Sequence, residues 1–197
     1  MGINLQKGQK IDLTKGSAGL KNIMVGLGWD EAEPTSKGLH GLFNKPKPID
    51  CDASAILCDD NGKYMNLVCY SNLKLGDGSV IHQGDNLTGE GEGDDEQIMV
   101  DLSKLSSSVG KIVFVVNIFQ AKARNQHFGM INNAFIRLVD MDKNIELCRF
   151  NLSENYYGME GLVVGEIYKR DNEWKFNAIG QPVKSASHIN DLTAMYM

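Results

Sequence analysis

The sequence has no long apolar run. Its longest apolar stretch, Ile112–Phe119, is interrupted by Asn117 and is far shorter than the ~20 residues that a membrane-spanning helix needs. The first sixteen residues, MGINLQKGQKIDLTKG, lack the apolar segment of a secretory signal. We therefore expect a soluble, cytoplasmic protein.

Cysteine is also scarce. The four cysteines form no CxxC pair and have no neighbouring histidine, which is typical of neither a zinc site nor a dense disulfide framework: they are Cys51, Cys58, Cys69 and Cys148. Three of them lie inside or beside strand patterns, where cysteine usually behaves as a small buried apolar residue. We expect reduced, buried thiols, and thiol-based catalysis is the less favoured interpretation.

No dense cluster of lysine and arginine is present to neutralise phosphates, so nucleic acid is not expected as a partner. The net charge is -5, and six of the 25 acidic residues lie in one run that contains no base. The rest of the chain has 20 basic residues against 19 acidic ones, so the excess acidity is local. The six acids are Asp85, Glu90, Glu92, Asp94, Asp95 and Glu96.

What the sequence does contain is a series of short strand patterns separated by turn residues. Asn61-Gly62 and Asp171-Asn172 are hairpin-turn signals, and residues 112–119 are apolar on both faces, as in a central strand. The pattern predicts an all-β fold, an antiparallel β-sandwich with a few short helices, in a single domain over residues 1–197. Strands are expected near 22–29, 53–58, 64–70, 98–102, 112–119, 134–139, 145–152, 162–168 and 173–179, and short helices near 102–109, 120–128 and 187–195.

Residues 31–48 contain three of the four prolines and little periodicity, so we interpret them as a surface loop insertion.

The acidic run has the composition of a calcium site. Its carboxylates repel one another unless a cation is present, and calcium takes six to eight oxygen ligands in flexible geometry. Interleaved glycines let a chain turn its carbonyl groups inward, and no soft ligand is present. From composition alone, a solvated charged loop is an equal alternative and magnesium stays open. The further oxygen donors of the run are Asn86, Thr88, Gly89, Gly91 and Gly93.

Two familiar motifs do not fit this run. An EF-hand would need side-chain oxygens where Leu87 and Gly89 stand, and glycine where Glu90 stands. A phosphate-binding P-loop needs Gly-Lys-Ser/Thr, and acids between the glycines would repel phosphate.

A second acidic group could complete such a site. Asp50 and Asp52 lie on the same side of an extended segment, and Asp30 follows the end of a predicted strand. Loops of a sandwich gather at its two ends, but spacing does not say whether these three residues share the end of the acidic run.

Residues 84–98, GDNLTGEGEGDDEQI, resemble the signature of the TerD family of bacterial tellurium-resistance and general stress proteins. Other stretches resemble family blocks in the expected order, so the resemblance covers nearly the whole chain. These stretches are VGLGWD (25–30), DASA (52–55), YSNL (70–73), GMINNAFIRLV (129–139) and WKFNAIGQ (174–181).

The resemblance implies a β-sandwich that binds one or two calcium ions through acidic loops, in a stress response linked to tellurium resistance. Asp50 ranks below the other implied ligands, and Glu90 and Glu92 are expected to point outward. The implied ligands are Asp30, Asp52, Asp85, Asn86, Thr88, Gly89, Gly91, Gly93, Asp94, Asp95 and Glu96.

Three functions remain for such a protein. The favoured one is a metal-organised interaction module with a protein partner, in a complex that could be associated with a membrane. The alternative is a calcium-dependent membrane-surface module resembling C2 domains, using Lys37, Leu42, Phe43, Lys45 and Lys47. An enzyme, either a metal-assisted hydrolase or a thiol-dependent oxyanion reductase, is least favoured, because no nucleophile–base–orienter set and no small-molecule substrate site is evident. His82 and Asn132-Asn133 are interpreted as turn residues; the less favoured alternatives are that His82 tunes the acidic run electrostatically and that Asn132-Asn133 hydrogen-bonds to a metal-site loop.

Overall fold

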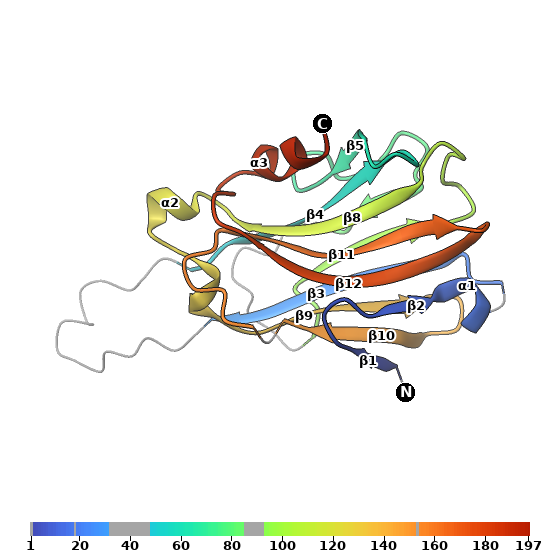
Figure 1. Ribbon diagram of the computed structural model, residues 1–197, viewed down its shortest axis with the longest axis horizontal. Helices are drawn as coiled ribbons and strands as arrows, with labels where there is room; N and C mark the ends of the chain where they lie inside the picture. Colours follow the sequence, from blue (N-terminus) through green and yellow to red (C-terminus); the bar gives the residue numbers. More distant parts are fainter. Residues whose placement is uncertain (1, 18, 32–47, 85–92, 153) are drawn as a thin grey trace.

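Two six-stranded sheets face each other in the computed structural model, which describes residues 2–17, 19–31, 48–84, 93–152 and 154–197 (Figure 1). The first sheet has the order β1 (Ile3–Leu5), β10 (Ile145–Asn151), β9 (Ile131–Asp140), β3 (Asn22–Glu31), β7 (Glu96–Asp101) and β6 (Val80–His82). The second has the order β2 (Lys10–Asp12), β12 (Glu173–Val183), β11 (Gly161–Arg170), β8 (Lys111–Ile118), β4 (Cys51–Cys58) and β5 (Tyr64–Val68).

The strand pairs described here are antiparallel except β1 with β10, which are parallel. The predicted antiparallel β-sandwich is therefore confirmed. The two hairpin signals are confirmed as well, because Gly62, Asp171 and Asn172 all have positive φ between paired strands.

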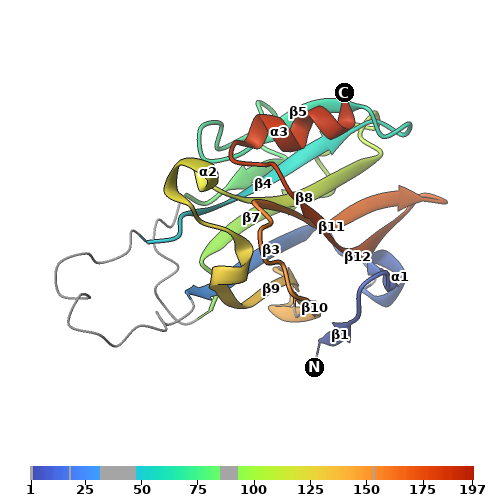
Figure 2. The ribbon, with the colours of Figure 1, turned by 60° about the vertical axis from the view of Figure 1, so that its left-hand side comes forward.

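The central strand β8 is buried on both faces. Ile112 and Phe114 point into the core between the sheets, whereas Val113 and Val115 join a second apolar cluster on the outer face. That outer cluster is closed by Leu192 of helix α3 (Ile189–Thr193), which lies over β4 and β8 (Figure 2). Complete burial of each such side chain contributes about 1.5–3 kcal/mol of transfer free energy, so β8 anchors the second sheet.

Two of the three expected helices are present in shortened form. The first is divided between α2 (Ala121–Arg124) and the 3-10 turn η2 (Phe128–Met130), and the other comprises α3 and η3 (Ala194–Tyr196). The helix expected at 102–109 is wrong, because this segment forms turns. The Asp101 carboxylate accepts hydrogen bonds from both the backbone N–H (3.0 Å) and the hydroxyl (2.6 Å) of Ser103, which favours a turn over a helix start.

The sequence patterns missed three strands of three residues each, β1, β2 and β6, and the four-residue helix α1 (Leu13–Gly16). Elements of three or four residues contain too few repeats of the strand or helix period to be recognised in a sequence. The expected loop insertion lies almost entirely at 32–47, outside the described residues. In the part of the chain that the structure covers, no helix is both long and apolar enough to cross a membrane.

The four cysteines are free and buried, as expected. Burial raises the pKa of the Cys58 thiol to about 11 and that of Cys148 to about 12. The pKa of Cys51 is also raised well above its ordinary value, first by burial and then by nearby carboxylates. Because the thiolate is the reactive form, these three side chains are poorly suited to redox chemistry.

We therefore expect Ellman's reagent at pH 8 to modify the native protein only at the rate of unfolding, and to titrate four thiols at once in guanidinium chloride. Absorbance at 412 nm measures both. Rapid modification of any thiol in the native protein would contradict this account of the cysteines and reopen the thiol-reductase interpretation.

Candidate metal centre

Strands β3 and β8 end, and β4 and β7 begin, at the same end of the sandwich (Figure 1). This arrangement brings both acidic groups of the sequence to one end. The described acids there are Asp30, Asp50, Asp52, Asp94, Asp95 and Glu96. Gly93, which directly precedes Asp94, is described and has φ 113. The other predicted ligands, Asp85, Asn86, Thr88, Gly89 and Gly91, lie outside the described residues, as do Glu90 and Glu92.

Asp94 is held by an arginine. Arg137 of β9 donates from Nε to Asp94 Oδ1 (2.7 Å) and from Nη2 to Oδ2 (2.8 Å), and Asp94 in turn raises the pKa of the guanidinium. A side chain at Gly26 would place its Cβ 2.3 Å from the Asp94 carboxyl carbon, so glycine is required there. The bidentate pair secures the start of β7 across β3.

Asp95 lies beside Asp30. Its Oδ2 accepts the backbone N–H of Trp29 (2.7 Å), and its own N–H donates to the Leu27 carbonyl (2.8 Å). The pKa of Asp95 is raised, mainly by burial and also by the charges of Asp30 and Asp94, with the Trp29 N–H acting against the rise. Two neighbouring carboxylates, of which Asp95 is partly buried, favour the binding of a cation.

The exposed Asp30 is oriented by β9. Asn133 donates from Nδ2 to Asp30 Oδ2 (2.7 Å), and Asn132 pairs with Asp30 in the ladder. The turn predicted at Asn132-Asn133 is therefore wrong. Asn133 has φ 53 inside β9, next to an irregularity in the pairing of β3 with β9, and asparagine tolerates this conformation better than most residues.

Glu96 joins the two sheets. Although it belongs to β7 of the first sheet, its Oε2 accepts the backbone N–H of Ala53 in β4 of the second (2.6 Å). His82 Nε2 lies 3.2 Å from the Ala53 carbonyl and 3.4 Å from Glu96 Oε2. His82 Nδ1 accepts the Gly84 N–H (3.1 Å), which leaves the proton of a neutral ring on Nε2, where it donates to Ala53.

His82 is thus a buried residue of β6, 2% exposed, and its prediction as a turn residue is wrong. The link has a clear local cause. The described ladder between β4 and β5 starts at Ala55, so at Ala53 the two side chains, instead of a neighbouring strand, satisfy the backbone.

Asp50 and Asp52 flank Cys51 at the start of β4 and are both buried. Asp50 Oδ2 lies 3.3 Å from Arg124 Nη1, and that guanidinium also lies 5.2 Å from the Phe119 ring centroid. Asp52 Oδ2 accepts a hydrogen bond from Nδ2 of Asn117 (3.4 Å). Arg124 partly neutralises the charge of Asp50.

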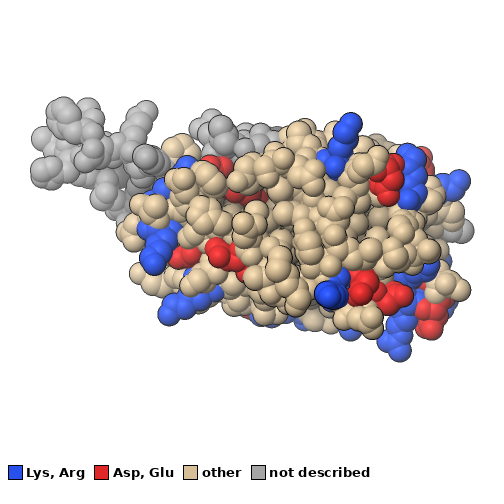
Figure 3. All heavy atoms as spheres, turned by 90° about the horizontal axis from the view of Figure 1, so that it is seen from above, with Lys and Arg blue, Asp and Glu red and all other residues tan. Residues whose placement is uncertain are grey.

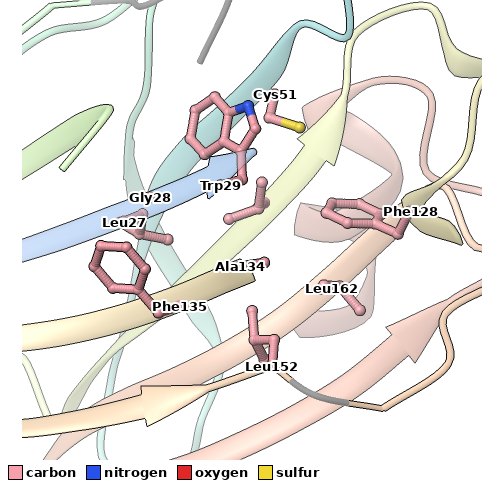
Figure 4. Close-up of a pocket in the computed structure, with 10 residues that line it drawn as sticks. Leu27, Gly28, Trp29, Cys51, Phe128, Ala134, Phe135, Leu152 and Leu162 are labelled. Carbon is pink, nitrogen blue, oxygen red and sulfur yellow. The ribbon is translucent and has the colours of Figure 1, made fainter. Parts of the chain in front are cut away.

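The carboxylates converge around Cys51. The charges of Glu96, Asp52, Asp50 and Asp95 all raise the pKa of its thiol, in that order of strength. Behind this group lies a small apolar cavity of about 10 Å³ between the sheets, lined by Trp29, Cys51 and Phe128 among others (Figure 4). It has room for about one water molecule.

The possible metal ligands at this end of the sandwich are carboxylate and amide oxygens, which are ligand types that calcium prefers. Among the described residues, however, no three His, Cys, Asp or Glu side chains are close enough to hold a metal ion by themselves. Sequence reasoning missed the residues that orient the acids. Their own patterns give no signal, since each is an isolated polar residue in or beside a strand: Arg137, Asn117 and Arg124. The hydrogen bond from Asn133 to Asp30 agrees instead with the less favoured interpretation of Asn132-Asn133, as partners of a metal-site loop.

Comparisons with known proteins agree with this architecture. Residues 1–196 match the family model described as TerD domain. Stress response protein SCP2 of Bacillus subtilis is 49% identical, covering 100% of both chains. Tellurium resistance protein TerD of Serratia marcescens is 42% identical and covers 92% of this chain and 91% of that protein.

A solved structure shares the fold. The crystal structure of a homologue of telluride resistance protein (TerD) from Streptomyces coelicolor superposes with a TM-score of 0.66 at 22% identity, covering 91% of this chain and 99% of that one.

The link through Glu96 yields a stability prediction. Glu96→Ala removes the acceptor of the buried Ala53 N–H, and an unsatisfied buried donor costs about 1–3 kcal/mol, so the free energy of unfolding should fall by that amount. Glu96→Gln keeps an oxygen for Ala53 and should lose clearly less. Urea denaturation in the presence of EDTA measures both without a contribution from metal; equal stability of the two variants would contradict the role given to the link.

Proposed function

The chain belongs to the TerD domain family, whose relatives are named as tellurium resistance and general stress proteins, and from this premise we propose that it is a calcium-binding member of a stress response. In this proposal one or two calcium ions bind at the acidic end of the sandwich. They organise the loops there into a surface that a protein partner recognises.

The observation that carries the proposal is the pair of Asp30 and Asp95. Burial and the neighbouring charges of Asp30 and Asp94 raise the pKa of Asp95, so the ionised form is disfavoured in the metal-free protein. A bound divalent cation would stabilise the ionised Asp95 carboxylate against both its burial and the neighbouring negative charges. Asp95 also directly follows residues 85–92, which supply further oxygen donors in the sequence.

The described residues would serve in different roles. Asp30 and Asp95 would bind the ion, with Asp52 and Glu96 as further carboxylates from β4 and β7. Asp94, paired with Arg137, would position the loop. Asn133 would hold Asp30 in orientation through its hydrogen bond.

We further propose that the protein acts by binding and has no catalysis of its own. The buried thiols of raised pKa support this, because a thiol-dependent oxyanion reductase would need accessible thiolate. A second, largely uncharged surface lies over β5 and α3, where charge is concentrated toward the ends (Figure 3). Exposed apolar side chains of β5, the turn after it and the C-terminus are Met65, Tyr70, Leu73, Met195 and Met197.

Calcium should raise the thermal stability of the wild-type protein by several degrees at saturating concentration, since 100-fold excess over the dissociation constant stabilises by about 2.7 kcal/mol. Excess EGTA should reverse the shift. Differential scanning fluorimetry measures it, with magnesium as the comparison ion and a smaller shift expected from it.

The double variant Asp30→Asn/Asp95→Asn should lose this shift while it keeps its hydrogen bonds, because asparagine retains an acceptor oxygen. Asp171→Asn is the matched control, since Asp171 lies in the β11–β12 turn and its positive φ suits asparagine. A wild-type protein with no calcium-dependent shift at millimolar ion would refute the proposal.

A further inference from the structure

Two glycines alternate along β3 within the stretch VGLGWD, residues 25–30. The apolar residues between them point into the core, so Gly26 and Gly28 lie on the outer face of the first sheet. Neither glycine is among those with positive φ, so backbone conformation does not require them. Glycine inside a strand often marks a place where another part of the chain approaches closely.

The side chain of Asp94 fills the space over Gly26, because a Cβ at Gly26 would overlap the Asp94 carboxyl group. Gly26 pairs with Gln97 of β7 on one side and with Arg137 of β9 on the other. Both neighbours donate to the carboxylate. Gln97 Nε2 donates to Oδ2 (3.4 Å), and Arg137 donates to both oxygens (2.7 and 2.8 Å). Asp94 therefore occupies the place that a side chain of β3 would take.

A second close approach follows at Gly28. A Cβ there would lie 2.6 Å from the carbonyl oxygen of Gly93, and it would also overlap the ring of Phe135. Gly93 has φ 113, a conformation that favours glycine. Gly93 and Asp94 thus lie over two outward-facing glycines of β3. The next residue, Asp95, donates its N–H to a backbone carbonyl of the same strand (2.8 Å).

The burial of Asp94 separates it from its neighbour Asp95. The Asp94 side chain is 0% exposed, and its bidentate pair with Arg137 compensates its charge. Asp95, by contrast, lies within electrostatic reach of Asp30. The two adjacent aspartates therefore differ in role, because one is held against the sheet while the other lies beside Asp30.

We propose that Gly26, Gly28 and Arg137 are positioning residues of the calcium site. They hold the end of the acidic run on the outer face of β3, and this placement fixes Asp95 beside Asp30. The inference rests on the proposed function, because the ion is taken to be calcium. It gives the alternating glycines of β3 a role toward that ion without making them ligands.

Gly165 of β11 provides a matched control in the second sheet. A Cβ at Gly165 would also lie too close to a neighbour, 2.6 Å from Phe176 Cζ, and Gly165 also lacks a positive φ. Its closest neighbours belong to β12. Gly165→Ala should therefore destabilise the protein through the same kind of steric clash without displacing the end of the acidic run.

Isothermal titration with calcium chloride of the EGTA-stripped protein tests the proposal, and a melting transition in EGTA shows that each variant folds. Gly26→Ala should weaken calcium binding at least about tenfold, the loss typical of removing a residue that orients a metal ligand. Gly165→Ala should keep wild-type affinity although its melting temperature falls. In an Asp94→Ala background, Gly26→Ala should weaken binding little further, because the clashing carboxylate is gone.

Arg137→Lys keeps the test decisive if Gly26→Ala does not fold. Lysine keeps the positive charge but loses the bidentate geometry, so positioning predicts weaker calcium binding. If Asp94 were itself a ligand, the arginine would compete with the ion, and the lysine variant would bind calcium at least as tightly as wild type.

Three results overturn the assignment and leave the proposed function standing. They are wild-type affinity in Gly26→Ala, equal losses of affinity in Gly26→Ala and Gly165→Ala, and equal or tighter binding by Arg137→Lys. Absence of calcium binding by the wild-type protein overturns both the assignment and the proposed function.

Discussion

The buried link between Glu96, His82 and Ala53 is the interaction on which the acidic end of the sandwich depends. Ala53 pairs with β8, but the described ladder between β4 and β5 does not reach it, and two side chains of the first sheet bond to its backbone N–H and C=O. The link fixes the start of β7 against β4. It therefore sets how close the acids that precede β7 come to those that begin β4.

Other contacts at this end stabilise the acidic side chains themselves. Arg137 compensates the charge of Asp94, and Arg124 lies beside Asp50. These two carboxylates therefore destabilise the metal-free protein little. Asp95 is different, because burial and its acidic neighbours raise its pKa. The described contacts thus compensate part of the excess charge, and the proposed calcium ion would bind where Asp30 and Asp95 lie side by side.

Much of this architecture could be predicted from the sequence, because it is encoded locally. The alternation in β7, the doubly apolar β8 and the turns at Gly62 and Asp171 are properties of a few adjacent residues. The helix expected after Asp101 was wrong because a local Asp101–Ser103 hydrogen-bond pattern outweighed helix formation. The composition of the acidic run pointed to its chemistry. What it could not give was the partners Arg137, Asn133 and Asn117, since each meets its acid through strand pairing over 43 to 103 residues of separation.

The most direct test of the calcium account is a crystal structure of the wild-type protein grown with calcium, with anomalous data to locate the ion. The account predicts an anomalous peak about 2.4 Å from a carboxylate oxygen of Asp95, at the end of the sandwich where β3 ends and β7 begins. A well-ordered acidic end with no such peak at millimolar calcium, or calcium bound only at other parts of the surface, would contradict it.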